Sequence, residues 1–134
     1  MNGKILEYFN WMGGVILGGI GYYLGGWDLL LKTILFLIVL DFCTGWLKSI
    51  LCKNLSYKKG LQGIIKKIII FIVVAVANIM QTLLDNTIPL RETIIMFYIL
   101  NEALSIIENA AYFIPIPKKL KNILLEFNDK YDGK

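Results

Sequence analysis

The sequence has 134 residues, is 57% hydrophobic and has a mean hydropathy of +0.63, which is too apolar for an ordinary water-soluble domain of this length. The net charge of +4 does not indicate nucleic-acid binding, because the lysines lie beside long apolar runs without an aromatic platform. The chain has no histidine, so we expect no enzyme, catalytic residue, metal or cofactor. Cys43 and Cys52 are interpreted as small apolar fillers rather than a disulfide.

Four apolar segments, at 8–26, 27–51, 64–84 and 93–114, predict an all-α integral membrane protein. A helix needs about 20 residues to cross roughly 30 Å of hydrocarbon, and each segment is near that length. The charged residues gather mainly in the short connectors between these segments. We therefore expect a single membrane domain, a small oligomeric bundle of three or four transmembrane helices.

The first segment, 8–26, is rich in glycine. Four of its glycines recur at steps of four, three and four residues, which places them on one helical face. In a membrane such a face lets another helix backbone approach closely. The alternative is an interfacial or re-entrant segment, because glycine lowers helix propensity. The expected helix-packing glycines are Gly14, Gly18, Gly21 and Gly25.

The other three segments carry stronger signs of spanning. Trp27 and Trp46 are far enough apart to lie near the two interfaces of one span. Residues 68–84 contain no charge, and the fourth segment ends before Pro115 and Pro117, which do not continue a helix comfortably.

The connector between the second and third segments contains lysines and no acidic residue, whereas the next connector contains Asp85, Arg91 and Glu92. The positive-inside rule then predicts a multi-pass protein of the bacterial inner membrane with this connector and the C-terminus in the cytoplasm. We expect a basic loop to bind anionic lipid headgroups through Lys58, Lys59, Lys66 and Lys67.

The tail at 118–131 has apolar residues at helical spacing, namely Leu120, Ile123, Leu124, Phe127 and Tyr131. This pattern favours an amphipathic helix on the inner membrane surface. A soluble, frayed tail is the alternative.

Polar residues also fall inside the apolar segments, where they are costly and therefore mark functional positions. In the fourth segment they share one arc of about 120°. They either line a pore between subunits or hydrogen-bond helices to one another within a subunit. The expected polar stripe comprises Asp41, Thr44, Lys48, Asn78, Gln81, Asn101, Glu102, Ser105, Glu108 and Asn109.

Asp41 is the most deeply placed acid of the second segment. Lys48 lies two turns away on the same face and is expected to extend toward the inner interface. Asp41 should therefore find a donor such as Thr44 or a lysine from another helix. An intramembrane aspartyl protease would need a second aspartate in a suitable membrane motif, and the sequence has none.

Three elements of the chain, the third made of two runs, resemble the phage lysis and clostridial toxin-secretion holin family. LDFCTGWLK at 40–48 is similar to its D-x-x-T/L-G-x-L-K element, and LSYKKGLQGIIKK at 55–67 to its Ser/Lys/Gly-rich loop. NEALSIIEN at 101–109 and IPIPKKL at 114–120 resemble its E-x-x-S-I-x-x-N helix and P-x-P-K/R-x-L turn. The runs occur in the family's order between about residues 35 and 121.

The resemblance implies a protein that associates with itself in the inner membrane and opens lesions that release an endolysin or a large toxin. Glu102 and Glu108 would line or trigger the lesion. The alternatives are a small ion channel or transporter subunit, which passes only ions, and a passive scaffold, which passes nothing. The expected partners are other copies of the chain, anionic lipid and, functionally, the released endolysin or toxin, with no nucleic acid.

Overall fold

A computed structural model describes residues 2–131, without the side chains at positions 124, 127, 128, 130 and 131. Five helices follow one another along the chain: α1 (Asn2–Tyr23), α2 (Leu29–Leu51), α3 (Tyr57–Leu83), α4 (Leu90–Ala111) and α5 (Lys118–Tyr131). The fold is all-helical over the described residues, as the apolar segments predicted.

Three of these helices, α2, α3 and α4, are long and apolar enough to cross a membrane, with mean hydropathies of 1.9, 2.3 and 1.3. α1, which contains most of the glycine-rich segment, does not reach the same hydropathy, because glycines, tyrosines and polar residues interrupt its apolar run. The described chain therefore supports three spans, the lower of the two numbers expected.

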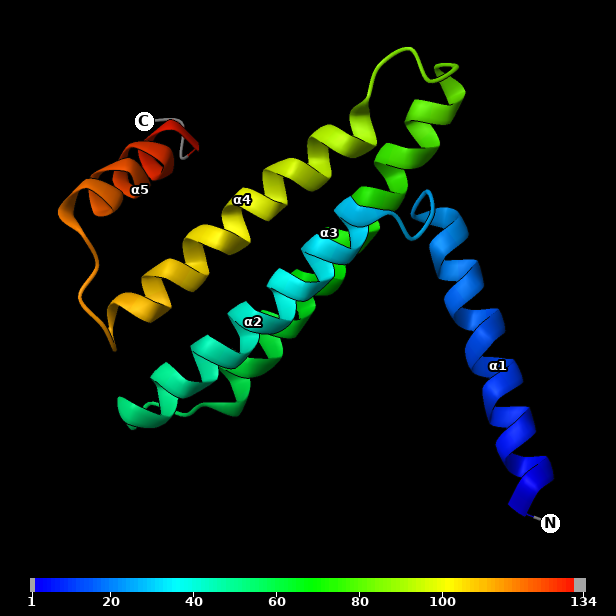
Figure 1. Cartoon of the computed structure of the whole chain (residues 1–134), viewed down its shortest axis with the longest axis horizontal. Coiled ribbons are helices and arrows are strands. Elements are labelled where there is room, and N and C mark those ends of the chain that lie inside the picture. The colour runs from blue at the N-terminus through cyan, green and yellow to red at the C-terminus, as the bar shows by residue number, and fades with distance from the viewer. Residues whose placement is uncertain (1, 132–134) are drawn as a thin grey trace.

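α2, α3 and α4 run antiparallel to their neighbours in sequence and form one elongated bundle (Figure 1). α4 packs against both α2 and α3. At one end of the bundle lie the last turn of α2, the lysine-rich connector and the first turn of α3; we call this the lysine-rich end. At the other end lie the starts of α2 and α4, and we call this the arginine end because Arg91 is there.

The two outer helices leave the bundle in different directions. α1 joins it at the arginine end and diverges from it, whereas α5 follows the proline-containing connector and reverses direction relative to α4 (Figure 1). α5 has the bounds expected for the amphipathic tail. The side chains at 124, 127 and 131, which make up much of its predicted apolar face, lie outside the described residues.

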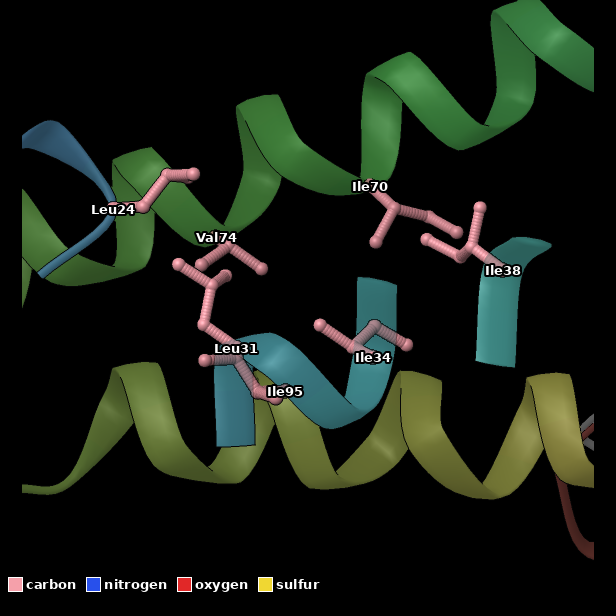
Figure 2. Close-up of a cluster of buried hydrophobic side chains, with 7 residues drawn as sticks. All are labelled: Leu24, Leu31, Ile34, Ile38, Ile70, Val74 and Ile95. Atoms are coloured by element: carbon pink, nitrogen blue, oxygen red, sulfur yellow. The ribbon is translucent and has the colours of Figure 1, made fainter. Parts of the chain in front are cut away.

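The bundle has a small apolar core (Figure 2). Leu31 and Ile34 of α2, Val74 of α3 and Ile95 of α4 are fully buried. Ile68, Ile72 and Val76, spaced by four residues on α3, are more than half exposed. An exposed apolar face of this length requires an apolar solvent, and lipid supplies it.

The end of α1 corrects the interpretation of Gly25. Gly25 lies beyond the helix with φ +87°, and the amides of Gly25 and Gly26 donate to the carbonyls of Tyr22 and Gly21. This is a Schellman motif, in which glycine at the left-handed position ends the helix. Gly25 therefore stops α1 and does not extend a glycine face along it.

The basic loop also differs from expectation, because α3 begins at Tyr57 instead of at position 64. Lys58 and Lys59 lie in its first turn, and Lys66 and Lys67 lie more than two turns inside it. The four lysines consequently belong to a helix, where each side chain has a fixed direction.

Candidate functional site

Three charged residues meet inside the bundle, one from each spanning helix. The Nζ of Lys67 on α3 lies 2.7 Å from an oxygen of Asp41 on α2 and 2.9 Å from an oxygen of Glu102 on α4. All three side chains are largely buried, with exposed fractions of 16%, 13% and 9%. We call this cluster the lysine triad.

The lysine triad lies near the middle of its helices. Asp41 and Lys67 are each ten residues from the lysine-rich end of their helix, and at 1.5 Å per residue this is about 15 Å. That depth is about half of the roughly 30 Å of hydrocarbon in a bilayer. Ionisable groups at this depth are expensive unless they pair with each other, which the triad allows.

Two further polar residues extend the cluster toward the lysine-rich end. The amide of Asn109 on α4 donates to the Oδ1 of Asp41 at 3.2 Å and to the Oγ1 of Thr44 at 3.1 Å. Thr44 donates in turn to the Leu40 carbonyl of its own helix at 2.9 Å. α2 and α4 are close at Gly45, where a Cβ would lie 3.7 Å from the Asn109 amide nitrogen, an ordinary van der Waals contact.

Asp41 therefore has the partner expected of it, a lysine from another helix. The sequence analysis predicts a different role for Lys67, in contact with lipid headgroups. The structure instead turns Lys67 into the bundle, while the neighbouring Lys66 is exposed. Adjacent residues on a helix point about 100° apart, so two consecutive lysines do not share one environment.

An open groove of about 1040 Å³ leads from the lysine-rich end to the lysine triad. Phe42, Gly45 and Trp46 of α2 form one side, and Gly60 and Gly63 of α3 contribute to the other. The polar stripe of α4 lines it through Asn101, Glu102, Ser105 and Asn109.

A second polar cluster, which we call the arginine clamp, closes the arginine end. Arg91 of α4 is 3% exposed, and its Nη1 lies 2.8 Å from the Oδ2 of Asp28, the N-cap of α2. Its guanidinium also donates to the carbonyls of Leu24 and Gly26 in the α1–α2 turn. These contacts satisfy carbonyls that the end of α1 leaves without helical partners.

Asn78 and Gln81 of α3 belong to the same cluster. The amide of Asn78 donates to the Tyr23 carbonyl at 3.1 Å, and the Oε1 of Gln81 accepts from the backbone amide of Arg91 at 2.8 Å. The hydrogen bond from Arg91 lowers the pKa of Asp28 below its usual 3.8. The clamp therefore keeps its ion pair at neutral pH.

The structure brings together six members of the predicted stripe in two clusters: Asp41, Thr44, Glu102 and Asn109 at the lysine triad, and Asn78 and Gln81 at the arginine clamp. Asn101 and Ser105 line the groove. Lys48 is half-buried without an acidic partner among the described residues, and Glu108 is exposed.

Of the predicted helix-packing glycines, Gly14 and Gly18 have no helix against them within the described subunit, whereas Gly25 lies against the side chains of Arg91 of α4 and Asn78 of α3. A Cβ at Gly14 or Gly18 would meet open space, whereas one at Gly21 would collide with the indole of Trp27. Trp27 in turn donates to the Leu17 carbonyl at 3.1 Å. The absence of a side chain at Gly21 therefore makes room for the indole of Trp27, which lies in the turn between α1 and α2.

The arginine clamp was missed because Asp28 and Arg91 are 63 residues apart. Two local signals were present. Asp28 directly precedes an apolar helix, as an N-cap residue does, and the Gly25–Gly26 pair is typical of a helix end. Neither signal identifies Arg91 as the partner.

Three apolar antiparallel helices with polar clusters between them define a small multi-pass α-helical membrane protein. Residues 18–129 match the bacteriophage holin family, and the chain belongs to that family.

Relatives of the chain include one probable holin and several uncharacterized proteins. The chain is 34% identical over 113 residues to a probable holin of Bacillus phage phi105, covering 84% of each protein. It is 45% identical over 130 residues to an uncharacterized 14.9 kDa protein in the nagH 3′ region of Clostridium perfringens, covering 95% of this chain and 98% of that one. An uncharacterized Listeria monocytogenes protein is 40% identical over 111 residues, 82% of this chain and 79% of its own. No solved structure matches the chain.

Proposed function

We propose that the protein is a holin that associates with itself in the bacterial cytoplasmic membrane and opens lesions through which an endolysin or a toxin leaves the cell. Membership of the bacteriophage holin family carries this proposal. The lysine triad supports it, because a cluster of one ammonium and two carboxylates near mid-membrane is costly and unnecessary for a bundle that only has to be stable.

The triad suggests how one sequence supports two states. In the subunit described here, Lys67 satisfies both Asp41 and Glu102, so the three helices hide their charges from lipid. If the helices separate, the same charges need water or polar groups of other copies. The ion pairs of the triad can be replaced by ion pairs or hydrogen bonds between subunits. Apolar core side chains, by contrast, would gain no interaction from exposure to water.

α4 also offers polar groups to a neighbouring copy. Asn101 and Glu108 are exposed on this spanning helix, and neither has a hydrogen-bond partner among the described residues. In lipid such groups favour association with another helix that supplies a donor or acceptor. Self-association through α4 is therefore part of the proposal.

The orientation proposed is with the lysine-rich end in the cytoplasm. Lys48, Lys53, Lys58 and Lys59 gather there, α5 begins at the same end, and the positive-inside rule puts such connectors inside. The C-terminal helix would then be cytoplasmic, and the arginine clamp would lie at the outer surface.

Release of cargo of different sizes tests the function. The purified protein is reconstituted into vesicles of bacterial lipid that contain both a potassium-sensitive dye and a folded fluorescent protein. A holin releases the folded protein, and expression in cells releases a co-expressed endolysin. Loss of the ion gradient with retention of the folded protein would instead identify an ion channel, and vesicles that stay sealed would identify a scaffold.

A further inference from the structure

We infer that the groove between α2 and α3 is a binding site for one anionic phospholipid of the cytoplasmic leaflet, with the phosphate at Lys59 and Lys66 and an acyl chain along the apolar wall. This inference rests on the proposed orientation but not on lesion formation. It assigns a ligand to a place in the fold, whereas a basic stretch of sequence predicts only general attraction to the membrane surface.

The groove exists because glycines replace side chains along it. Gly60 and Gly63 of α3 line it, and a Cβ at either position would meet nothing within 4 Å. Gly45 opens the facing side of α2. The volume of about 1040 Å³ lies at the upper end of the range for small-molecule sites, which is roughly 300–1,000 Å³.

The mouth of the groove is suited to a phosphate. Lys59 lines it in the first turn of α3, and Lys66 lines it seven residues further along the same face, about 10 Å along the axis, from where its long side chain can extend back toward the mouth. Both are exposed, and neither forms an ion pair among the described residues. The hydroxyl-bearing residues Ser49, Ser56 and Tyr57 line the same groove. Basic pockets between transmembrane helices on the cytoplasmic side are characteristic sites for anionic headgroups.

Along the rest of the groove the lining includes the apolar side chains of Phe42, Trp46, Ile64, Ile69 and Ile70. These residues suit an acyl chain. The carboxylates at the floor do not repel it, because Asp41 and Glu102 already face the ammonium of Lys67. A cationic segment of a second copy, such as the lysine-rich start of α5, would meet Lys59 and Lys66 at the mouth, so charge favours the anionic lipid.

Quenching of Trp46 by brominated lipid tests the site directly. Trp11 and Trp27 are replaced with phenylalanine, so that Trp46 is the remaining tryptophan. The protein is placed in phosphatidylcholine vesicles with a small fraction of brominated phosphatidylglycerol, and in phosphatidylglycerol vesicles with the same fraction of brominated phosphatidylcholine. Stronger quenching in the first mixture measures preferential binding of the anionic lipid beside Trp46.

Replacing Lys59 or Lys66 with glutamine should lower this preference about fivefold for each lysine, which corresponds to ~1 kcal/mol. Gly63→Leu, which fills the groove, should abolish the preference with both lysines retained. Lys58→Gln is the matched control, because Lys58 is an exposed lysine of the same helical turn that does not line the groove.

Equal quenching by both lipids would overturn the inference, as would an equal loss of preference in Lys58→Gln. Protection of Trp46 from both lipids would show that a second copy covers the groove and would also overturn it. Inorganic phosphate added at the same concentration as the anionic lipid should not reduce the quenching; a reduction would show a phosphate site without lipid specificity. The vesicle-release assay is read separately, so loss of lesion formation is distinguishable from loss of lipid binding.

Discussion

The ammonium of Lys67 lies 2.7 Å from a carboxylate oxygen of Asp41, which joins α3 to α2 near the middle of two spanning helices. Lys67 also faces Glu102 at 2.9 Å, so one cation satisfies carboxylates from two different helices. Removal of this single side chain therefore affects every helix of the bundle.

Lys67→Met should be strongly destabilising. It leaves two carboxylates facing each other without a cation, and breaking a buried ion pair by removing one partner costs about 3 kcal/mol or more. The free energy of unfolding in mixed micelles measures this cost. Lys66→Met is the control, because Lys66 is exposed and lacks an acidic partner among the described residues. Similar losses in both variants would contradict the role of the triad.

Replacing Glu102 with glutamine should partly rescue Lys67→Met. In the double variant Asp41 faces a neutral amide, so the carboxylate repulsion created by the first substitution disappears. The coupling between contacting sites is expected to be about 1 kcal/mol or more in the favourable direction. A double-mutant cycle on unfolding free energies provides the measurement. Strictly additive losses would show that Lys67 and Glu102 do not interact energetically.

The sequence predicted the class of fold because three long apolar helices need no tertiary information to be recognised. It also predicted that Asp41 needs a donor such as Thr44 or a lysine from another helix. It did not identify Lys67, because the helix start was expected at position 64, which places Lys67 at the membrane surface. The structure starts α3 at Tyr57, which places Lys67 about 15 Å from the start of the helix. The Asp28–Arg91 pair needed the folded chain, since no local pattern joins residues so far apart.

Asp28→Asn should loosen the α1–α2 turn. Arg91 retains its bonds to the Leu24 and Gly26 carbonyls but loses its charged partner, the Asp28 carboxylate. Hydrogen exchange of the backbone amides at 24–28 measures the loosening. Replacing Glu92, which lies 3.6 Å from Arg91, with glutamine should have a smaller effect.

The same pair predicts a pH dependence. Because the folded pKa of Asp28 is lowered, its stabilising effect is fully present above the usual carboxylate value of 3.8 and is lost as the pH falls through the lower folded pKa. Protection of amides 24–28 should thus stay constant from pH 7 to about 5 and fall only in stronger acid. Asp28→Asn should remove this step. If the variant loses amide protection at the same pH as the parent protein, the loss comes from other carboxylates.

Leucine in place of both Glu102 and Glu108 should favour membrane insertion and abolish lysis. An acid at the centre of a spanning helix costs about 2.5 to 3.5 kcal/mol, whereas leucine is favourable there. The structure separates the two roles: Glu102 belongs to the lysine triad, and Glu108 is exposed. Glu108→Leu alone should leave the unfolding free energy unchanged while delaying lysis, followed as culture turbidity after induction. Unchanged timing in the double variant would rule out these carboxylates as lesion residues.

Leucine at Gly14 and Gly18 tests whether α1 contacts another copy. A side chain at either position meets open space within the subunit, so the double variant should retain its unfolding free energy or gain up to about 1 kcal/mol of helix propensity per position. If these glycines pack against a helix of a second copy, the bulkier side chains should reduce the yield of chemically cross-linked oligomers severalfold. Gly19→Leu is the matched control, because Gly19 is equally open but lies about 100° around the helix from Gly18. Undiminished cross-linking in the double variant would show that the glycine face of α1 does not mediate self-association. The exposed polar groups of α4 would then be the surface proposed for it.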